Sequence, residues 1–158
     1  MSIQAGDRIP EAILQYVDDG VHKIDTLALF EGRKFLLFSV PGAFTPTCSE
    51  RHLPGFVEHF DEFKKRGIRV ACMAMNDPFV MGAWGQSQHV PEDLRMLSDG
   101  NGDFTRGLGL QMDASAFGMG TRSKRFALYI EDGIVSQAFV EAPGEFKVSS
   151  AENVLANL

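Results

Sequence analysis

Cysteine is scarce in this sequence: its 158 residues include two, Cys48 and Cys72, and these do not form a Cys-x-x-Cys pair. Two cysteines cannot build the disulfide framework of a small extracellular domain, and dithiol exchange at a Cys-x-x-Cys motif is excluded. No cluster of Cys and His in the sequence completes the three or four ligands that zinc sites use. The sequence therefore predicts a fold that depends on its core alone, with no metal and no cofactor.

Positive charge and long apolar runs are also lacking. Lys and Arg number 15 against 21 Asp and Glu, which gives a net charge of −6 and a pI near 5.1. Nucleic acids and anionic membranes require a clustered basic face, so neither is an expected partner. No apolar run approaches the roughly 20 residues that cross a bilayer, and residues 1–7 do not resemble a secretory signal. We expect a cytoplasmic protein with a small, neutral or weakly charged substrate.

The apolar residues that are present predict a single α/β domain over residues 1–158. Residues 35–40 and 68–75 are nearly continuous apolar runs, which are typical of strands covered on both faces. A helix between them would make these strands parallel. We expect it to bend at Pro54-Gly55 and to end near Gly67. Its core-facing positions are Leu53, Phe56, Val57, Phe60 and Phe63.

Two hairpins are expected at either end of this unit. Residues 13–17 and 21–24 flank a turn and predict an N-terminal β-hairpin, and residues 125–131 and 134–140 flank Asp132-Gly133, a strong hairpin signal. The other expected elements are a short helix or turn at 25–32, a helix at 79–88, a strand at 94–98, a helical turn at 104–108 and a closing helix at 150–158. The glycine-rich region 99–121 shows weak periodicity.

Cys48 lies where the first strand gives way to the helix. Pro41-Gly42 ends the strand, and two helix starts compete: Thr45 as N-cap with Pro46 at the first helical position, or Thr47 as N-cap with Glu50 in a capping box. Both place Cys48 in the first turn. Unpaired backbone N–H groups there stabilise an anion, so the sequence predicts a reactive thiolate.

Two neighbouring residues suit this chemistry. The Thr45 hydroxyl can donate a hydrogen bond to the thiolate or to an oxygen that is about to react with it. Pro41 can shield the sulfur from bulk water. Thr45 could equally serve as a simple N-cap, and capping does not exclude catalysis.

The segment also resembles a known family. Pro41-x-x-x-Thr45-x-x-Cys48 resembles the active-site motif of the peroxiredoxins, and the run Pro-Gly-Ala-Phe-Thr-Pro-Thr-Cys-Ser, followed by His-Leu-Pro-Gly-Phe at 52–56, resembles their type II branch, the relatives of peroxiredoxin five. The resemblance continues through residues 70–77, Trp84-Gly85 and Arg125-Phe126. It implies a thioredoxin-like fold, a central mixed β-sheet flanked by helices, and a homodimer. It also implies that Cys48 is the peroxidatic cysteine and Arg125 a catalytic arginine.

Sheet geometry is compatible with that role for Arg125. If the strand that begins at Arg125 runs antiparallel to the strand that ends at Val40, the Arg125 guanidinium lies at the same sheet edge as the Cys48 sulfur. Its guanidinium could then stabilise the thiolate and the charge that develops during O–O cleavage. Arg122 and Lys124 compete on position alone, and the resemblance selects Arg125.

The implied reaction is the reduction of hydrogen peroxide and small alkyl hydroperoxides, with Cys48 becoming a sulfenic acid that a second thiol must reduce. Cys72 lies in a predicted buried strand, so a disulfide with Cys48 would require local unfolding. Some type II relatives carry a resolving cysteine near the carboxyl terminus, but residues 144–150 contain none. We therefore expect an external reductant, either glutaredoxin with glutathione or thioredoxin.

Other readings remain open. His52, four residues after Cys48, could form a Cys-His nucleophilic pair or a metal site, or it could fix the active-site loop by a hydrogen bond. A Cys-His pair would predict an acyl-transfer enzyme that responds little to peroxide. A peroxide-sensing redox protein without rapid turnover is the other alternative.

Overall fold

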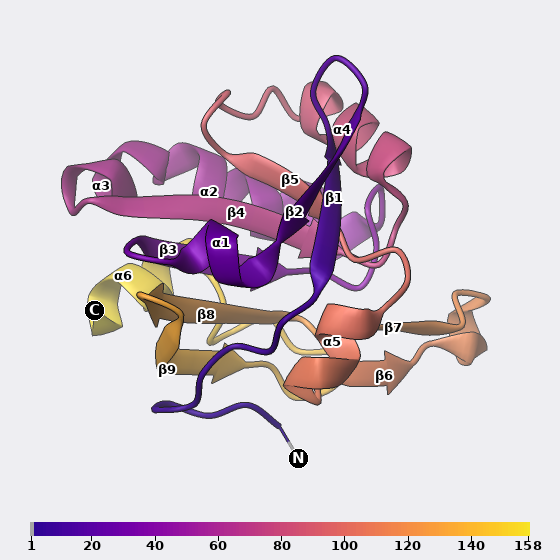
Figure 1. Cartoon of the computed structure of the whole chain (residues 1–158). Coiled ribbons are helices and arrows are strands. Elements are labelled where there is room, and N and C mark those ends of the chain that lie inside the picture. The colour runs from indigo at the N-terminus through magenta and orange to yellow at the C-terminus, as the bar shows by residue number, and fades with distance from the viewer. Residues whose placement is uncertain (1) are drawn as a thin grey trace.

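The computed structural model describes residues 2–158, and Figure 1 labels its elements. The strands are β1 (Ile13–Val17), β2 (Val21–Asp25), β3 (Lys34–Ser39), β4 (Ile68–Ala74), β5 (Arg95–Ser98), β6 (Gln111–Asp113), β7 (Thr121–Ser123), β8 (Phe126–Glu131) and β9 (Ile134–Val140). The helices are α1 (Thr26–Phe30), α2 (Leu53–Glu58), α3 (Phe60–Lys65), α4 (Pro78–Ser87), α5 (Asp103–Leu108) and α6 (Ala151–Asn157), with a π-helical turn at Cys48–His52 and a 3₁₀ turn at Ser115–Phe117.

Seven strands form one mixed sheet in the order β2-β1-β5-β4-β3-β8-β9, and β6 and β7 form a separate ribbon. The three central strands β3, β4 and β5 are parallel, whereas β1 and β8 run antiparallel to their neighbours. Both expected hairpins are confirmed, as is the parallel pair joined by a helix. The β8–β9 turn has φ of 49° at Asp132 and 77° at Gly133, the left-handed geometry of a two-residue hairpin.

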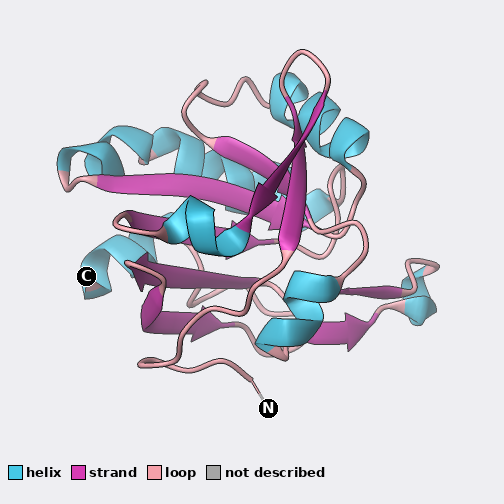
Figure 2. Cartoon of the chain, viewed as in Figure 1, coloured by secondary structure: helices cyan, strands magenta, loops and turns pink. Residues whose placement is uncertain are grey.

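Helices cover both faces of the sheet (Figures 1 and 2). Along β3, Leu36 and Phe38 pack in a cluster with residues of α2, α3, α4 and α6, whereas Phe35 and Leu37 pack on the other face with residues of α1 and α5. Successive side chains of a strand point to opposite faces, so a continuously apolar strand supplies both clusters at once. This explains why β3 and β4 read as unbroken apolar runs.

The helix that follows Cys48 is interrupted at other places than we expected. Pro54-Gly55 lies within α2, and the irregular geometry occurs in the preceding π-helical turn and at His59, between α2 and α3. Proline lacks an N–H, and its ring clashes with the carbonyl four residues earlier, so the turn before Pro54 takes up the distortion. The β6–β7 ribbon was not predicted, because its three-residue strands lie in the glycine-rich region.

The edge of the sheet that holds Cys48 is defined by β3, β4 and β8. β3 ends at Ser39, which pairs with Phe126 at the start of antiparallel β8. Arg125 therefore precedes β8 at the edge where the chain leaves β3 toward Cys48. No helix within residues 2–158 has the length and apolar character that a bilayer crossing demands.

Candidate active site

The helix that carries Cys48 begins at Pro46. Residues 46 and 47 are helical, the Ser49 N–H donates to the Thr45 carbonyl at 2.9 Å, and Thr47 has helical φ and ψ of −63° and −37° without a side-chain cap. The start with Pro46 at the first helical position is therefore confirmed, and the Thr47 capping box is wrong. Cys48 is the third helical residue, within the first turn, and is 0% exposed.

The turn that starts at Cys48 is π-helical. The Leu53 N–H donates to the Cys48 carbonyl, five residues back, and the next residue, Pro54, has no N–H to donate. Single π turns inside helices are rare and occur frequently at functional sites. The helix that holds the sulfur is thus less regularly hydrogen-bonded than a continuous α-helix.

The structure brings Arg125 to Cys48. Arg125 Nη2 donates to Cys48 Sγ at 3.1 Å, across 77 residues of sequence. A guanidinium keeps its positive charge at all ordinary pH values, and hydrogen bonds to ionised acceptors are about twice as strong as neutral ones. The contact therefore favours negative charge on the sulfur.

His52 connects Arg125 to the loop after β9. Its Nδ1 lies 3.0 Å from Arg125 Nη1 and its Nε2 lies 3.0 Å from the Ser149 carbonyl. The carbonyl only accepts and the guanidinium only donates, so the ring must carry its proton on Nε2. Burial, together with the Arg125 charge, lowers the pKa of His52 to about 3.

This arrangement argues against the Cys-His reading. Both His52 nitrogens are bound to other groups, and a neutral ring of such low basicity is a poor general base for Cys48. The expectation that His52 fixes the active-site loop by a hydrogen bond agrees with its bond to Ser149. Within residues 2–158, no group of three or more His, Cys, Asp or Glu side chains is arranged to hold a metal ion.

Thr45 and Pro41 lie in the loop that leads to Cys48, and both are half-buried. The Thr45 hydroxyl donates to the Gly42 carbonyl at 2.6 Å rather than to the sulfur. A hydroxyl has one hydrogen and two lone pairs, so in this state Thr45 can accept a hydrogen bond from a substrate, and it must rotate to donate one.

Two residues whose roles the sequence did not reveal hold the loop in place. Asn76 Oδ1 accepts from the Ala43 N–H at 2.8 Å, and Trp84 Nε1 donates to Ser49 Oγ at 2.9 Å. Asn76 follows β4, which is parallel to β3, so the carboxyl ends of both strands lie at one edge. That placement is the signal that could have identified Asn76 in advance.

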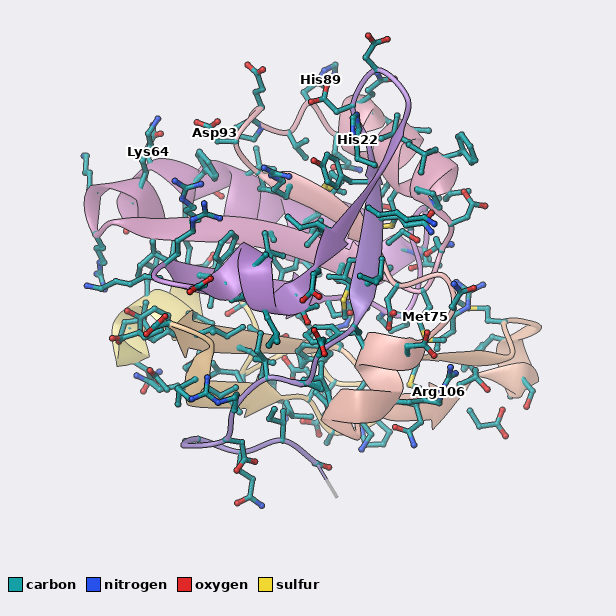
Figure 3. The ribbon with its side chains drawn as sticks, in the orientation of Figure 1. His22, Lys64, Met75, His89, Asp93 and Arg106 are labelled. Atoms are coloured by element: carbon teal, nitrogen blue, oxygen red, sulfur yellow. The ribbon has the colours of Figure 1, made fainter. Side chains whose placement is uncertain are left out.

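Of the two competing cations, Arg122 binds a backbone carbonyl and not the sulfur. Arg122 Nε donates to the Met119 carbonyl at 2.9 Å. A further arginine that was not a candidate, Arg106 on α5 (labelled in Figure 3), donates to the Asn101 carbonyl at 2.7 Å and to Asp103 Oδ1 at 2.9 Å. Among these arginines, Arg125 is the one with a hydrogen bond to the sulfur of Cys48.

Cys72 lies in β4, paired with Phe38 on one side and Met96 on the other, and is 0% exposed. Burial, with a contribution from nearby Cys48, raises the pKa of the Cys72 thiol well above its ordinary value. The predicted buried position is confirmed, and this thiol stays protonated and unreactive at neutral pH.

The chain is similar to known proteins over nearly its whole length. A family model described as Redoxin matches residues 4–155. Peroxiredoxin-2B of Arabidopsis thaliana is 43% identical over 159 residues, which cover 99% of this chain and 98% of that protein. Chloroplastic Peroxiredoxin-2E-2 of Oryza sativa subsp. japonica is 48% identical over 164 residues, which cover 99% of this chain and 73% of that protein.

Among solved structures, that of reduced Prx3 in complex with H₂O₂ from Vibrio vulnificus superposes with a TM-score of 0.94 at 46% identity, covering 98% of each chain. The expected thioredoxin-like fold, with a mixed sheet flanked by helices, is confirmed by this match. The chain belongs to the Redoxin family and is a type II peroxiredoxin, a thiol-dependent peroxidase.

Proposed function

We propose that Cys48 is the peroxidatic nucleophile and that Arg125, Thr45 and Pro41 complete the catalytic site. The observation that carries this assignment is the 3.1 Å hydrogen bond from Arg125 Nη2 to a sulfur that is 0% exposed. In a site from which water is excluded, the guanidinium stabilises negative charge more strongly than it would in water. It is also already in place when that charge develops during the reaction.

The chemical step is an attack of the Cys48 thiolate on one oxygen of the hydroperoxide ROOH. An S–O bond forms, the O–O bond breaks, and the sulfur becomes a sulfenic acid while RO⁻ departs and takes a proton to become ROH. Arg125 stabilises the negative charge as it moves from the sulfur to the departing oxygen. Thr45 accepts the hydrogen bond of the peroxide O–H, and Pro41 limits access of water.

The substrates are hydrogen peroxide and small alkyl hydroperoxides. The sulfur is fully buried, so only a small molecule can reach it while the first turn stays folded. A bulky hydroperoxide would have to displace the loop that Asn76 and Trp84 hold.

The reductant is an external thiol, supplied by glutaredoxin with glutathione or by thioredoxin. One thiol condenses with the sulfenic acid to a disulfide and water, and a second thiol releases Cys48 and leaves as the other disulfide. Cys72 is held in the middle of β4 between two paired strands, and a disulfide requires specific side-chain directions, so pairing with Cys48 would require local unfolding. Opening of the π-helical turn would expose the Cys48 sulfur to a protein thiol.

The active form is a homodimer. Three phenylalanines stand unusually exposed: Phe44 at 55%, Phe79 at 67% and Phe117 at 82%. They belong to segments that meet near the site, because Asn76 binds Ala43 and the Met119 side chain lies against Gly42. Exposed apolar surface of this kind marks protein interfaces, and a Phe44→Ser, Phe117→Ser double variant should sediment as a monomer.

The chain works as one domain, residues 1–158, in the cytoplasm. Support comes from its two free cysteines, which a reducing compartment keeps in the thiol form that the cycle needs.

Steady-state peroxide consumption tests this function. Reduced protein is supplied with hydrogen peroxide and either glutathione with glutaredoxin or thioredoxin with its reductase. We expect multiple turnovers with at least one system. A single oxidation without turnover in both systems would favour the peroxide-sensing alternative, and a stable thioester formed from an activated ester would favour acyl transfer.

A further inference from the structure

Just beyond β9, a buried carboxylate lies at the base of the loop that reaches the active site. Glu141 is 6% exposed, and its Oε2 accepts three hydrogen bonds: from Lys147 N at 2.8 Å, Ser149 N at 2.8 Å and Ser149 Oγ at 2.7 Å. Burial raises the pKa of Glu141, but these bonds outweigh it and hold the pKa below its ordinary value. The side chain is therefore an anion that closes the loop 141–149 onto itself.

Ser149 links the Glu141 carboxylate to His52 in the active site. Its N–H and hydroxyl bind Glu141, while its carbonyl accepts from His52 Nε2 at 3.0 Å. The next residue, Ser150, caps α6 by accepting from the Asn153 N–H at 3.1 Å. The Ser149 carbonyl is thus held between the carboxylate and the start of α6.

The orientation of this carbonyl decides what His52 offers to Arg125. With the proton held on Nε2 by Ser149, Nδ1 presents a lone pair to Arg125 Nη1 at 3.0 Å. If the proton moved to Nδ1, the ring would turn an N–H toward a guanidinium that can only donate. Arg125 would then lose the bond that aims its other nitrogen, Nη2, at Cys48.

Glu141 also contacts Arg125 directly through the main chain. The Glu141 N–H donates to the Arg125 carbonyl at 3.0 Å. The same loop carries Phe146, whose ring centroid lies 5.0 Å from that of His52 and 5.8 Å from the Arg125 guanidinium carbon. The Arg125 carbonyl, the His52 ring and the Arg125 guanidinium therefore all contact the loop that Glu141 closes.

Resting on the roles of Cys48 and Arg125 in the proposed function, we propose that Glu141 is a positioning residue of the peroxide reaction. Through Ser149 and His52, its carboxylate holds the Arg125 guanidinium against the sulfur. Arginine has many rotamers, and a misplacement of about 1 Å at a reacting centre can cost on the order of 100-fold in rate.

The test compares Glu141→Ala and Glu141→Gln with Glu145→Gln, which changes an exposed carboxylate of the same loop. The rate of Cys48 oxidation by hydrogen peroxide is measured by mass, next to urea unfolding. We expect Glu141→Ala to slow oxidation by about 10- to 100-fold and Glu145→Gln to leave it unchanged. Glu141→Gln keeps an oxygen acceptor, so it should recover part of the rate, and it carries the test if Glu141→Ala does not fold.

A double-mutant cycle and the His52 ring separate positioning from general destabilisation. In an Arg125→Ala background, removal of Glu141 should have little further effect, because its route to the sulfur is gone. The ¹⁵N spectrum of His52 should show one Nε2–H tautomer in the wild type and a mixture in the Glu141 variant.

Three results would overturn the proposal: a folded Glu141→Ala protein that reacts at the wild-type rate, equal slowing with and without Arg125, or an unchanged His52 tautomer. Failure of the proposed function would look different. In that case, Cys48→Ser would still react with peroxide, whatever the Glu141 variants did.

Discussion

Arg125 and His52 are paired through a single lone pair: Arg125 Nη1 donates to His52 Nδ1 at 3.0 Å, which leaves Nη2 to donate to the Cys48 sulfur at 3.1 Å. The two bonds use the fixed fork of the guanidinium, whose nitrogens point in set directions. One fixed bond therefore determines the other.

Replacement of Arg125 should act on the chemical step. Arg125→Ala removes the donor that faces the developing charge, so we expect the second-order rate of Cys48 oxidation by peroxide to fall by about 100- to 1,000-fold. Lys124→Ala, at the neighbouring position, is the matched control and should change the rate little. Equal losses in both variants would reject the assignment of Arg125.

The low basicity of His52 predicts a pH dependence of stability. In the unfolded chain this histidine takes up a proton near pH 6.5, whereas in the folded protein burial and the Arg125 charge lower its pKa to about 3. The unfolded state therefore binds more protons between these values, and the free energy of unfolding should fall by about 1.4 kcal/mol per pH unit as the pH drops below 6.5.

Urea unfolding of the wild type and His52→Gln between pH 7 and pH 5 measures this slope. Glutamine retains a donor for the Ser149 carbonyl but does not titrate, so its curve should lack the His52 contribution. His59 has a raised pKa, chiefly from its hydrogen bond to Glu62, and contributes with the opposite sign in both proteins. If the two proteins lost stability in parallel, His52 would not be buried in its neutral form.

Much of the fold could be predicted because its signals are local. The apolar runs of β3 and β4, the Asp132-Gly133 turn and the helical spacing after Cys48 each act within a few residues. The two candidate helix starts at Thr45 and Thr47 could not be separated, because both carry capping residues. In the structure the helix begins at Pro46, a position that proline favours at a helix start.

The site residues that the sequence did not reveal make their contacts only once distant or folded-back segments pack together. Glu141 looks like one more acidic residue until Ser149 folds back over it, eight positions later. Trp84 reads as a core residue, and its bond to Ser49 depends on how α4 packs beside the π-helical turn. No local pattern encodes either contact.

Trp84 should report the opening of the turn that carries Cys48. It is the single tryptophan of the chain, is buried, and binds Ser49 Oγ, one residue beyond the cysteine. Oxidation by peroxide followed by addition of glutathione should shift the Trp84 fluorescence emission to longer wavelength, because the hydrogen bond to Ser49 breaks and water reaches the indole ring. Cys48→Ser should show no shift, and an equal shift in that variant would mean that Trp84 senses something else.

Substitutions at Cys72 should affect stability but leave the chemistry intact. Cys72→Ser puts a hydroxyl into an apolar cluster between Phe38 and Met96, and we expect a loss of about 1–3 kcal/mol in the free energy of unfolding. Cys72→Ala avoids the buried hydroxyl and should cost less. Lys64→Ala serves as a surface control: Lys64 is exposed, and its loss breaks only the 3.8 Å ion pair with Asp93 (Figure 3). This variant should change the free energy of unfolding by less than about 1 kcal/mol. A Cys72→Ser protein as stable as the wild type would contradict the packing described for β4.

The most direct measurement adds one equivalent of hydrogen peroxide to the reduced protein and locates the oxidised sulfur by mass. We expect a gain of one oxygen on Cys48 in the wild type and in Cys72→Ala, and no rapid gain in Cys48→Ser. Rapid oxidation that survives in Cys48→Ser and disappears in Cys72→Ala would contradict the central claim that the sulfur held by Arg125 is the one that reacts.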